Sequence, residues 1–392
     1  MLAELANHND DIRRLLEKGY ALGVDEGYLV VRDVPYLDNQ GSLQTGAIVA
    51  KFDLIDKVRV RQDNHQVWFA GTIPHGLDGK PIPNLGAASA TLPLKKGDVV
   101  VEYRLSNKPH GLKGFVDFFE KIESYVRMIS GPAMERHDTT PYTFRVDREC
   151  TSDSVFKFQD TLTSRAEIGD LAALFKNEVV AIIGLGGTGS YVFDFLVKTP
   201  VQEIRGFDGD PYHVHNAFRS PGRLEESELG KAKAEVYATR YDNFRHGLAL
   251  RQKYIDASSA DDLAGVTFAF VCVDKGSARS GIFDLLVRLR IPFIDVGMGL
   301  KRKQGTLSGM LRVTYYSAED AASVRDMQLA EMVDDPDDLY KTNIQISELN
   351  ALNACLAVMR YKQLRGFYAD ENASYHMLME AETLRIFAER RP

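Results

Sequence analysis

The pattern of apolar and polar positions is clearest in the second half of the chain. Residues 179–183 form an unbroken apolar run with the length of a buried parallel strand. A glycine-rich turn follows, then an amphipathic helix with an apolar stripe of Tyr191, Val192, Phe195 and Leu196. A second strand is expected at about residues 203–207. This order of strand, glycine turn, helix and strand predicts a nucleotide-binding βαβ unit.

Strands and helices continue to alternate after this unit. Apolar runs predict strands at 248–255, 266–273, 291–296 and 305–316, the last one antiparallel, and helices at 276–288 and from Ile346 to about Arg365. The acidic segment 318–338 is interpreted as a solvated loop or a flexible crossover above a partner's tail. The alternation predicts an α/β domain with a Rossmann-like, doubly wound, mostly parallel sheet over residues 155–392.

The first 150 residues have a different pattern. Short apolar runs predict strands at 28–31, 47–52, 66–70 and 99–103, and 115–128 is predicted to be an amphipathic helix. Pro, Gly and Asn cluster between 71 and 97, which indicates turns or a long loop. We expect a smaller α+β domain over residues 1–150, with either a partner-recognition role or a structural, dimer-forming one.

Composition limits the possible functions. The chain has 392 residues, 48 basic and 55 acidic side chains and a formal net charge of −7, which disfavours a general nucleic-acid binder. No apolar run is long enough for a membrane span, and residues 1–18 show no signal-peptide pattern. We therefore expect no nucleic-acid partner, no membrane contact and a cytoplasmic location.

The glycines give the first indication of chemistry. Gly184, Gly186 and Gly189 form G-x-G-x-x-G after the first strand, and Asp208 ends the second strand. Glycines let the backbone approach phosphate, and a helix N-terminus favours its negative charge. Taken alone, this pattern is also the dinucleotide fingerprint of NAD enzymes.

Several charged residues beyond Asp208 favour a triphosphate instead. Four cations follow within a short span, and Asp274 ends another apolar run; the cations are Arg219, Arg223, Lys231 and Lys233. Cations offset phosphate charge, and a strand-end carboxylate can hold Mg²⁺. Each residue also has an interpretation without a ligand. Lys231 and Lys233 would then be surface lysines, Arg219 would form an ion pair in a loop, and Asp274 would cap the N-terminus of a helix.

In this order, the residues resemble the ThiF/MoeB/HesA superfamily, which contains the adenylating domains of ubiquitin-activating enzymes and their bacterial relatives. The resemblance covers about residues 155–392. It is carried by a G-x-G-G-x-G loop that includes Gly187, by Asp208-Gly209-Asp210, by the Asn216-x-x-Arg219 motif, by Lys233 at a helix start and by Asp274. The region before it resembles uncharacterised modules that precede ThiF-like domains in bacterial proteins.

The resemblance implies roles for these residues, with ATP and Mg²⁺ as cofactors. Asp208 would bind the ribose. The phosphates would be bound by Asn216, Arg219 and Lys233, and the metal ion would be bound by Asp274. The C-terminal carboxylate of a ubiquitin-like protein or peptide would attack the α-phosphate. This step needs positioning and charge neutralisation rather than acid–base catalysis, because a carboxylate is already ionised at neutral pH. A homodimer is implied as well.

The chain also departs from the family pattern. Ser220 stands where the family usually has Gln. Many members receive an arginine from the neighbouring subunit, and Arg165 is the candidate here. Many bind zinc through paired Cys-x-x-Cys motifs, which this chain lacks, so we expect no structural zinc.

Three cysteines indicate a reducing compartment rather than a disulfide framework. Cys272 and Cys355 are expected in apolar elements, where thiols are usually inert, and Cys150 lies in the linker. We therefore do not expect a thioester step, although the context of Cys150 leaves it open. Three functions remain: an adenylating enzyme, an NAD-dependent oxidoreductase, and a non-catalytic scaffold subunit of an activating enzyme.

Overall fold

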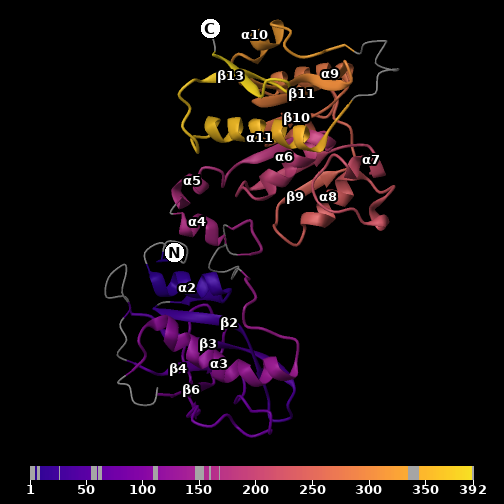
Figure 1. Cartoon of the computed structure of the whole chain (residues 1–392). Coiled ribbons are helices and arrows are strands. Elements are labelled where there is room, and N and C mark those ends of the chain that lie inside the picture. The colour runs from indigo at the N-terminus through magenta and orange to yellow at the C-terminus, as the bar shows by residue number, and fades with distance from the viewer. Residues whose placement is uncertain are drawn as a thin grey trace. The chain divides into compact units, whose positions relative to one another are not determined.

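The computed structural model describes residues 5–6, 9–25, 27–53, 60, 64–108, 114–145, 154–158, 160–166, 168–333 and 344–390, without the side chains of Ser164 and Arg165. The chain divides into two compact units, Met1–Gly169 and Asp170–Pro392 (Figure 1). Each unit has its own sheet and its own apolar core. Among the helices of these described ranges, none is long and apolar enough to cross a membrane.

The first unit is an antiparallel sheet with helices on one face. The strands are β1 (Ala21–Asp25), β2 (Tyr28–Leu37), β3 (Leu43–Lys51), β4 (Val67–Ala70), β5 (Ala88–Ser89) and β6 (Tyr103–Leu105), in the order β1-β2-β3-β4-β6-β5. Apolar residues of α2 (Asp10–Lys18) and α3 (Phe118–Arg136) pack against one face of this sheet. The predicted α+β architecture is therefore confirmed for this unit.

One predicted strand of this unit was wrong in part. The strand expected at 99–103 begins only at Tyr103. Val99 and Val101 instead pack their side chains onto the outer face of the sheet, against Val30 and Val49. The alternation of apolar and polar residues around Val99 and Val101 is therefore explained by packing on the sheet and not by pairing with a neighbouring strand.

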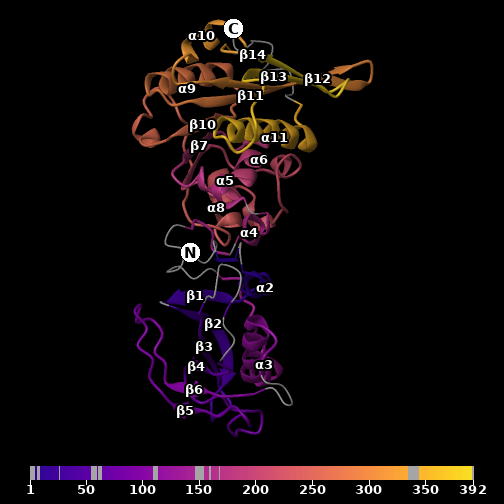
Figure 2. The ribbon, with the colours of Figure 1, turned by 90° about the vertical axis from the view of Figure 1, so that its left-hand side faces the viewer.

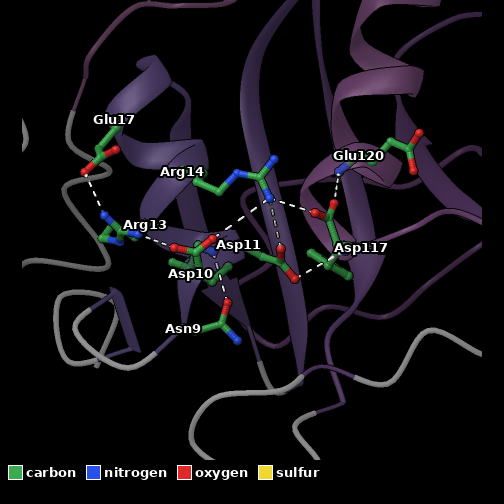
Figure 3. A network of polar contacts seen from close by, with 10 residues as sticks. Asn9, Asp10, Asp11, Arg13, Arg14, Glu17, Asp117 and Glu120 are labelled. Carbon is green, nitrogen blue, oxygen red and sulfur yellow. Dashed lines mark hydrogen bonds and ion pairs between the residues drawn. The ribbon is translucent and has the colours of Figure 1, made fainter.

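An ionic network joins the N-terminal ends of α2 and α3 (Figure 3). Arg14 lies at its centre, with Nη1 2.7 Å from Oδ2 of Asp117 and the guanidinium 3.9 Å from the centroid of the Phe119 ring. Asp117 also caps α3 by accepting a hydrogen bond from the backbone N of Glu120. Asp11 accepts one from Phe118 N. These contacts fix two helix ends together, and their role is structural.

The second unit is built on an eight-stranded sheet in the order β14-β13-β12-β11-β10-β7-β8-β9. Five neighbouring strands are parallel, namely β7 (Val179–Ile183), β8 (Glu203–Phe207), β9 (Leu248–Arg251), β10 (Phe268–Val271) and β11 (Phe293–Lys303). Three antiparallel strands extend the sheet, namely β12 (Thr306–Tyr316), β13 (Ser374–Glu380) and β14 (Arg385–Arg390). The predicted mostly parallel, Rossmann-like sheet is confirmed.

Helices cover both faces of this sheet (Figure 2). Val180 and Ile182 of β7 point to the face covered by α6 (Gly187–Val197), α8 (Lys233–Tyr241) and α11 (Ser347–Leu364). Ala181 and Ile183 point to the face covered by α9 (Gly276–Arg288) and α10 (Ala321–Asp326). The unbroken apolar run of β7 is thus explained by burial on both sides.

The remaining elements are short, and some differ from expectation. They are α4 (Thr161–Arg165), α5 (Gly169–Ala173), α7 (Val214–Ala217) and the 3₁₀ turns Glu226–Glu228 and Asp261–Leu263. The segment 318–338 was expected to be a loop, but it contains α10, because Ala321 and Val324 pack against the core. Residues 334–343 of the proposed crossover lie outside the described residues.

Candidate functional site

The candidate site lies where neighbouring parallel strands end. β10, β7 and β8 are adjacent in the sheet and run in one direction, so the segments that follow them meet at one edge. These segments carry Asp274 after β10, the glycine loop after β7 and Asp208 after β8. In open α/β sheets, ligands bind outside this edge, at the point where the strand order reverses. Here the order reverses between β7 and β10.

The glycines of the loop face different surroundings. Gly184 has φ +94°, and a Cβ there would lie 2.6 Å from the backbone O of Cys272. A Cβ on Gly189 would lie 1.9 Å from the backbone O of Gly184, so this glycine allows α6 to pack tightly on the loop. A Cβ on Gly186 would meet no atom of the described residues within 4 Å. Gly186 is the N-cap of α6 and makes no side-chain cap, which leaves open space before a helix N-terminus, where phosphate binds well.

Asp208 and Lys233 form a buried pair beside this loop. Their side chains are each only 7% exposed, and Nζ of Lys233 lies 3.3 Å from Oδ1 of Asp208. The carboxylate of Asp208 also accepts hydrogen bonds from the backbone N atoms of Leu185, at 2.8 Å, and Asp210, at 2.9 Å. Asp208 therefore fixes the start of the glycine loop. Its expected contact with ribose stays a prediction.

Asp210 completes this cluster and brings in a residue that the sequence did not single out. Nζ of Lys233 donates a 2.8 Å hydrogen bond to Oδ2 of Asp210, and the hydroxyl of Tyr254 donates to Oδ1. Burial alone would raise the pKa of Asp210, but these two hydrogen bonds hold that pKa below its usual value. The Tyr254 ring lies on Gly209, where a Cβ would come within 2.4 Å of it. The only sequence signal was an aromatic residue in the run 248–255.

The charges at the strand ends act on Tyr254 together. Its hydrogen bond to Asp210 raises the pKa of the Tyr254 hydroxyl to about 12, and burial and the negative charges of Asp208 and Asp274 act in the same direction. Asp274 is exposed and lies between β10 and α9. Asp274 thus lies close enough to Tyr254 for its charge to act on that hydroxyl.

The Asn216–Arg219 segment forms a short turn. Asn216 is buried, and its Oδ1 accepts a hydrogen bond from the backbone N of His213 at 2.8 Å, so it closes the first turn of α7. Ser220, at the position where the family usually has Gln, donates from Oγ to the backbone O of Asn216. The side chain of Arg219 is partly buried, and its Nε is buried with no hydrogen-bond partner among the residues that the structure describes. A buried donor without a partner is costly, and an anionic ligand would satisfy it.

A second cluster that the sequence did not reveal supports the Asp274 segment. Arg279 of α9 is buried and donates from Nε to Oδ1 of Asp295 at 3.1 Å. It also donates to the backbone O of Val273, next to Asp274, and of Glu331. Asp295 is fully buried at the end of the parallel part of β11 and also binds Arg312. Spacing in the sequence gave no signal, because the pair comes from separate elements.

The remaining sequence predictions concern Arg165 and the cysteines. Residue 165 ends α4 in the first unit, and its side chain is outside the described residues. Cys272 follows β10, and burial raises the pKa of its thiol far above the usual value, which disfavours a reactive thiolate. Cys150 lies outside the described residues. Within the described parts of the chain, no group of three or more His, Cys, Asp or Glu residues is arranged to hold a metal ion.

Two family models match the chain. The model described as the ThiF family matches residues 164–382, and the one described as a domain of unknown function (DUF6791) matches residues 10–161. The first match spans more than half of the chain and includes the five parallel strands, β7 to β11, and the candidate site.

Individual relatives are more distant. A tRNA threonylcarbamoyladenosine dehydratase from Escherichia coli (strain K12) is 25% identical over 128 residues, which are 32% of this chain and 47% of that protein. The chain therefore spans about half the length of this curated relative. A crystal structure of E. coli MccB with ATP has 18% identity and a TM-score of 0.44, covering 57% of this chain and 67% of that one. A structure of PaaA has 16% identity and a TM-score of 0.44, with 73% and 87% covered.

Proposed function

Because the chain belongs to the ThiF family, we propose that it is an ATP- and Mg²⁺-dependent adenylyltransferase that activates a substrate carboxylate. One cluster of groups carries the proposal. The N-terminus of α6 has open space at Gly186, the Lys233 cation lies beside the same loop, and the buried Nε of Arg219 has no hydrogen-bond partner within the described residues. This set offers backbone donors and cations to a polyphosphate.

We propose the following roles for these residues in binding ATP. The phosphates would approach Gly186 and the first turn of α6, where the helix dipole favours negative charge. Arg219 and Lys233 would offset phosphate charge, with Asn216 holding the turn that carries Arg219. Asp208 and Asp210 would face the ribose side, with Asp208 exchanging one of its present hydrogen bonds for a ribose hydroxyl.

Asp274 is the residue we propose to hold Mg²⁺. Mg²⁺ in nucleotide enzymes is bound through one or two carboxylates, the substrate phosphates and water, so it needs no all-protein cage. A single exposed carboxylate at a strand end fits this donor set. When bound, the ion would offset charge on the phosphates.

The proposed reaction is a displacement at phosphorus. A carboxylate oxygen of the substrate forms a bond to the α-phosphorus, and the bond from that phosphorus to the oxygen bridging to the β-phosphate breaks. Pyrophosphate leaves with the electron pair, and an acyl-adenylate remains. No general base is required, because the attacking carboxylate carries no proton at neutral pH. The residues of the site position the reactants and stabilise negative charge.

We further propose that the carboxylate is the free C-terminus of a ubiquitin-like protein or peptide. We also propose that two chains form a homodimer, in which Arg165 of one subunit contributes to the nucleotide site of the other. The net charge of −7 supports a protein partner over a nucleic acid. Although the E. coli relative is named for a tRNA nucleoside, it matches only 128 residues of this chain. Mixing Arg165→Ala with Asp274→Ala chains tests the shared site, since only mixed dimers would regain an intact one.

A ligand-binding titration tests the proposal. The purified protein is titrated with ATP–Mg²⁺, ATP–EDTA and NADH while its melting temperature is followed, because a ligand that binds only the folded state raises it. We expect stabilisation by ATP that depends on Mg²⁺ and is lost in Arg219→Ala. Arg223→Ala is the matched control, because Arg223 has a side chain 86% exposed. Stabilisation by NADH alone would indicate an oxidoreductase, and no response to either nucleotide would indicate a scaffold subunit.

A further inference from the structure

A buried asparagine at the start of α11 contacts the glycine loop. Asn350 is 1% exposed and lies in the first turns of the helix, whose other buried positions are mostly small or apolar. The helix was expected to be simply apolar, so a buried amide there needs an explanation. The hydroxyls of Ser347 and Tyr191 are hydrogen-bonded at 2.6 Å, which fixes this end of α11 against α6.

The amide of Asn350 lies directly against Gly187. A Cβ on Gly187 would come within 2.4 Å of Nδ2, 2.6 Å of Cγ and 2.7 Å of Oδ1 of Asn350. A Cβ on the adjacent Gly186 would meet no atom of the described part of the chain within 4 Å. The two consecutive glycines therefore serve different neighbours. Gly186 leaves room on the open side of the loop, and Gly187 admits Asn350 on the buried side.

Both ends of the amide are used in hydrogen bonds to different segments. Oδ1 accepts from Oγ1 of Thr188, in the first turn of α6, at 2.9 Å. Nδ2 donates a long hydrogen bond of 3.5 Å to the backbone O of Arg219. One side chain thus joins the glycine loop to Arg219, whose buried Nε has no hydrogen-bond partner in the described ranges.

We propose that Asn350 is a positioning residue that holds Arg219 in register with the glycine loop, so that both contact the same nucleotide phosphates. This inference rests on the proposed function. The physical reason is preorganisation: donors aimed in advance at a polyphosphate avoid the cost of ordering when the ligand binds. Arg219 and the loop come from separate segments, and Asn350 contacts both.

The variants Asn350→Asp, Asn350→Ala and Thr188→Val test this role. Asn350→Asp keeps the shape and the acceptor for Thr188 but removes the donor to Arg219 O and adds a negative charge beside the phosphates. We expect it to weaken binding of a non-hydrolysable ATP analogue by about 100-fold, and Asn350→Ala by about 10-fold. Thr188→Val provides a milder change, with about 3-fold weaker binding, if the Asn350 variants fail to fold.

Asn353→Ala is the matched control. Asn353 is a fully buried asparagine one turn further along α11, and it donates to the backbone O of Gly297 instead of contacting the loop. We expect this variant to lower the melting temperature as much as Asn350→Ala does, but to leave the affinity for the ATP analogue within about 2-fold of the wild type. A general loss of helix stability would lower affinity in both variants alike.

A double-mutant cycle separates this role from a merely structural one. If Asn350 positions Arg219, then Arg219→Ala should cost less affinity in the Asn350→Ala background than in the wild type. Additive effects, or Asn350 variants that bind the analogue as well as the wild type does, would overturn the inference while leaving the proposed function intact. A wild-type protein that does not bind ATP would reject both.

Discussion

Lys233 donates a 2.8 Å hydrogen bond from Nζ to Oδ2 of Asp210, and the same Nζ lies 3.3 Å from Asp208. The cation proposed to bind phosphate is thus already held by two carboxylates. The two carboxylates fix the position of this cation and also partly neutralise its charge. The cation should therefore bind a strongly anionic ligand in preference to a weakly charged one. Polyphosphate can compete for this cation because it carries several negative charges.

Replacing Lys233 by Ala should reduce both stability and nucleotide binding. The buried carboxylate of Asp208 would lose its cation, which costs about 3 kcal/mol in comparable buried pairs. Binding of ATP should become undetectable by thermal shift. Lys231→Ala is the control, because the Lys231 side chain is 50% exposed and its ion pair with Glu235 is 3.8 Å long. In urea unfolding, the free energy of unfolding of Lys231→Ala should lie within about 0.5 kcal/mol of the wild-type value.

The glycine loop offers a second pair of substitutions with opposite expectations. Gly186→Ala fills open space at φ −75°, so its stability should change by less than about 1 kcal/mol, while ATP binding is lost because the methyl group occupies the phosphate position. Gly189→Ala places a methyl group against a backbone oxygen 1.9 Å away and should cost at least about 2 kcal/mol. Normal ATP binding by a folded Gly186→Ala protein would contradict the proposed loop function.

Asp274→Asn should abolish the Mg²⁺ dependence of nucleotide binding. In the wild type, ATP–Mg²⁺ at 100 times its Kd should stabilise the fold by about 2.7 kcal/mol. The variant should bind ATP–Mg²⁺ and ATP–EDTA with the same weak affinity, because the neutral amide of Asn lacks the negative charge that attracts Mg²⁺. Calorimetric titration in both buffers measures this. A variant that still binds ATP more tightly with Mg²⁺ would assign the metal to another residue.

The pair of Asp210 and Tyr254 predicts a dependence of stability on pH. The pKa of Asp210 lies below its usual value of 3.8, against the effect of burial, because Lys233 and Tyr254 donate hydrogen bonds to it. A carboxyl with a lowered folded-state pKa contributes stability above its unfolded pKa, and this contribution disappears as the pH falls through the folded-state pKa. Tyr254→Phe should raise the pKa of Asp210.

The variant should therefore lose less stability than the wild type between pH 6 and acidic pH below 3.8, although it starts from a lower value. Urea unfolding across this range compares the two curves, and carbon-13 NMR of the carboxyl follows Asp210 directly. Parallel curves would show that Tyr254 does not act on Asp210 in solution.

Much of the second unit was predictable, because its local patterns are strong. The helix expected at 276–288 has the same bounds in the structure, and β7 and β8 match the strands expected at 179–183 and at about 203–207. The strands β13 and β14 were missed. All six residues of β14 are exposed, and its apolar residues, Ile386 to Ala388, are consecutive and do not alternate with polar ones, so the sequence shows no one-sided strand pattern. β14 forms a strand by pairing with β13.

The sequence by itself determined the order of strand, glycine turn, helix and acidic strand end, because a buried parallel strand must be apolar and a phosphate turn must lack side chains. It also indicated which charged residues follow the strands. Only the tertiary structure decided that Lys233 binds Asp208 and Asp210, that Asn350 reaches Gly187 and Thr188, and that Arg279 supports the Asp274 segment. These contacts join residues between 6 and 163 positions apart, and in most of them only the packing of separate elements brings the side chains together.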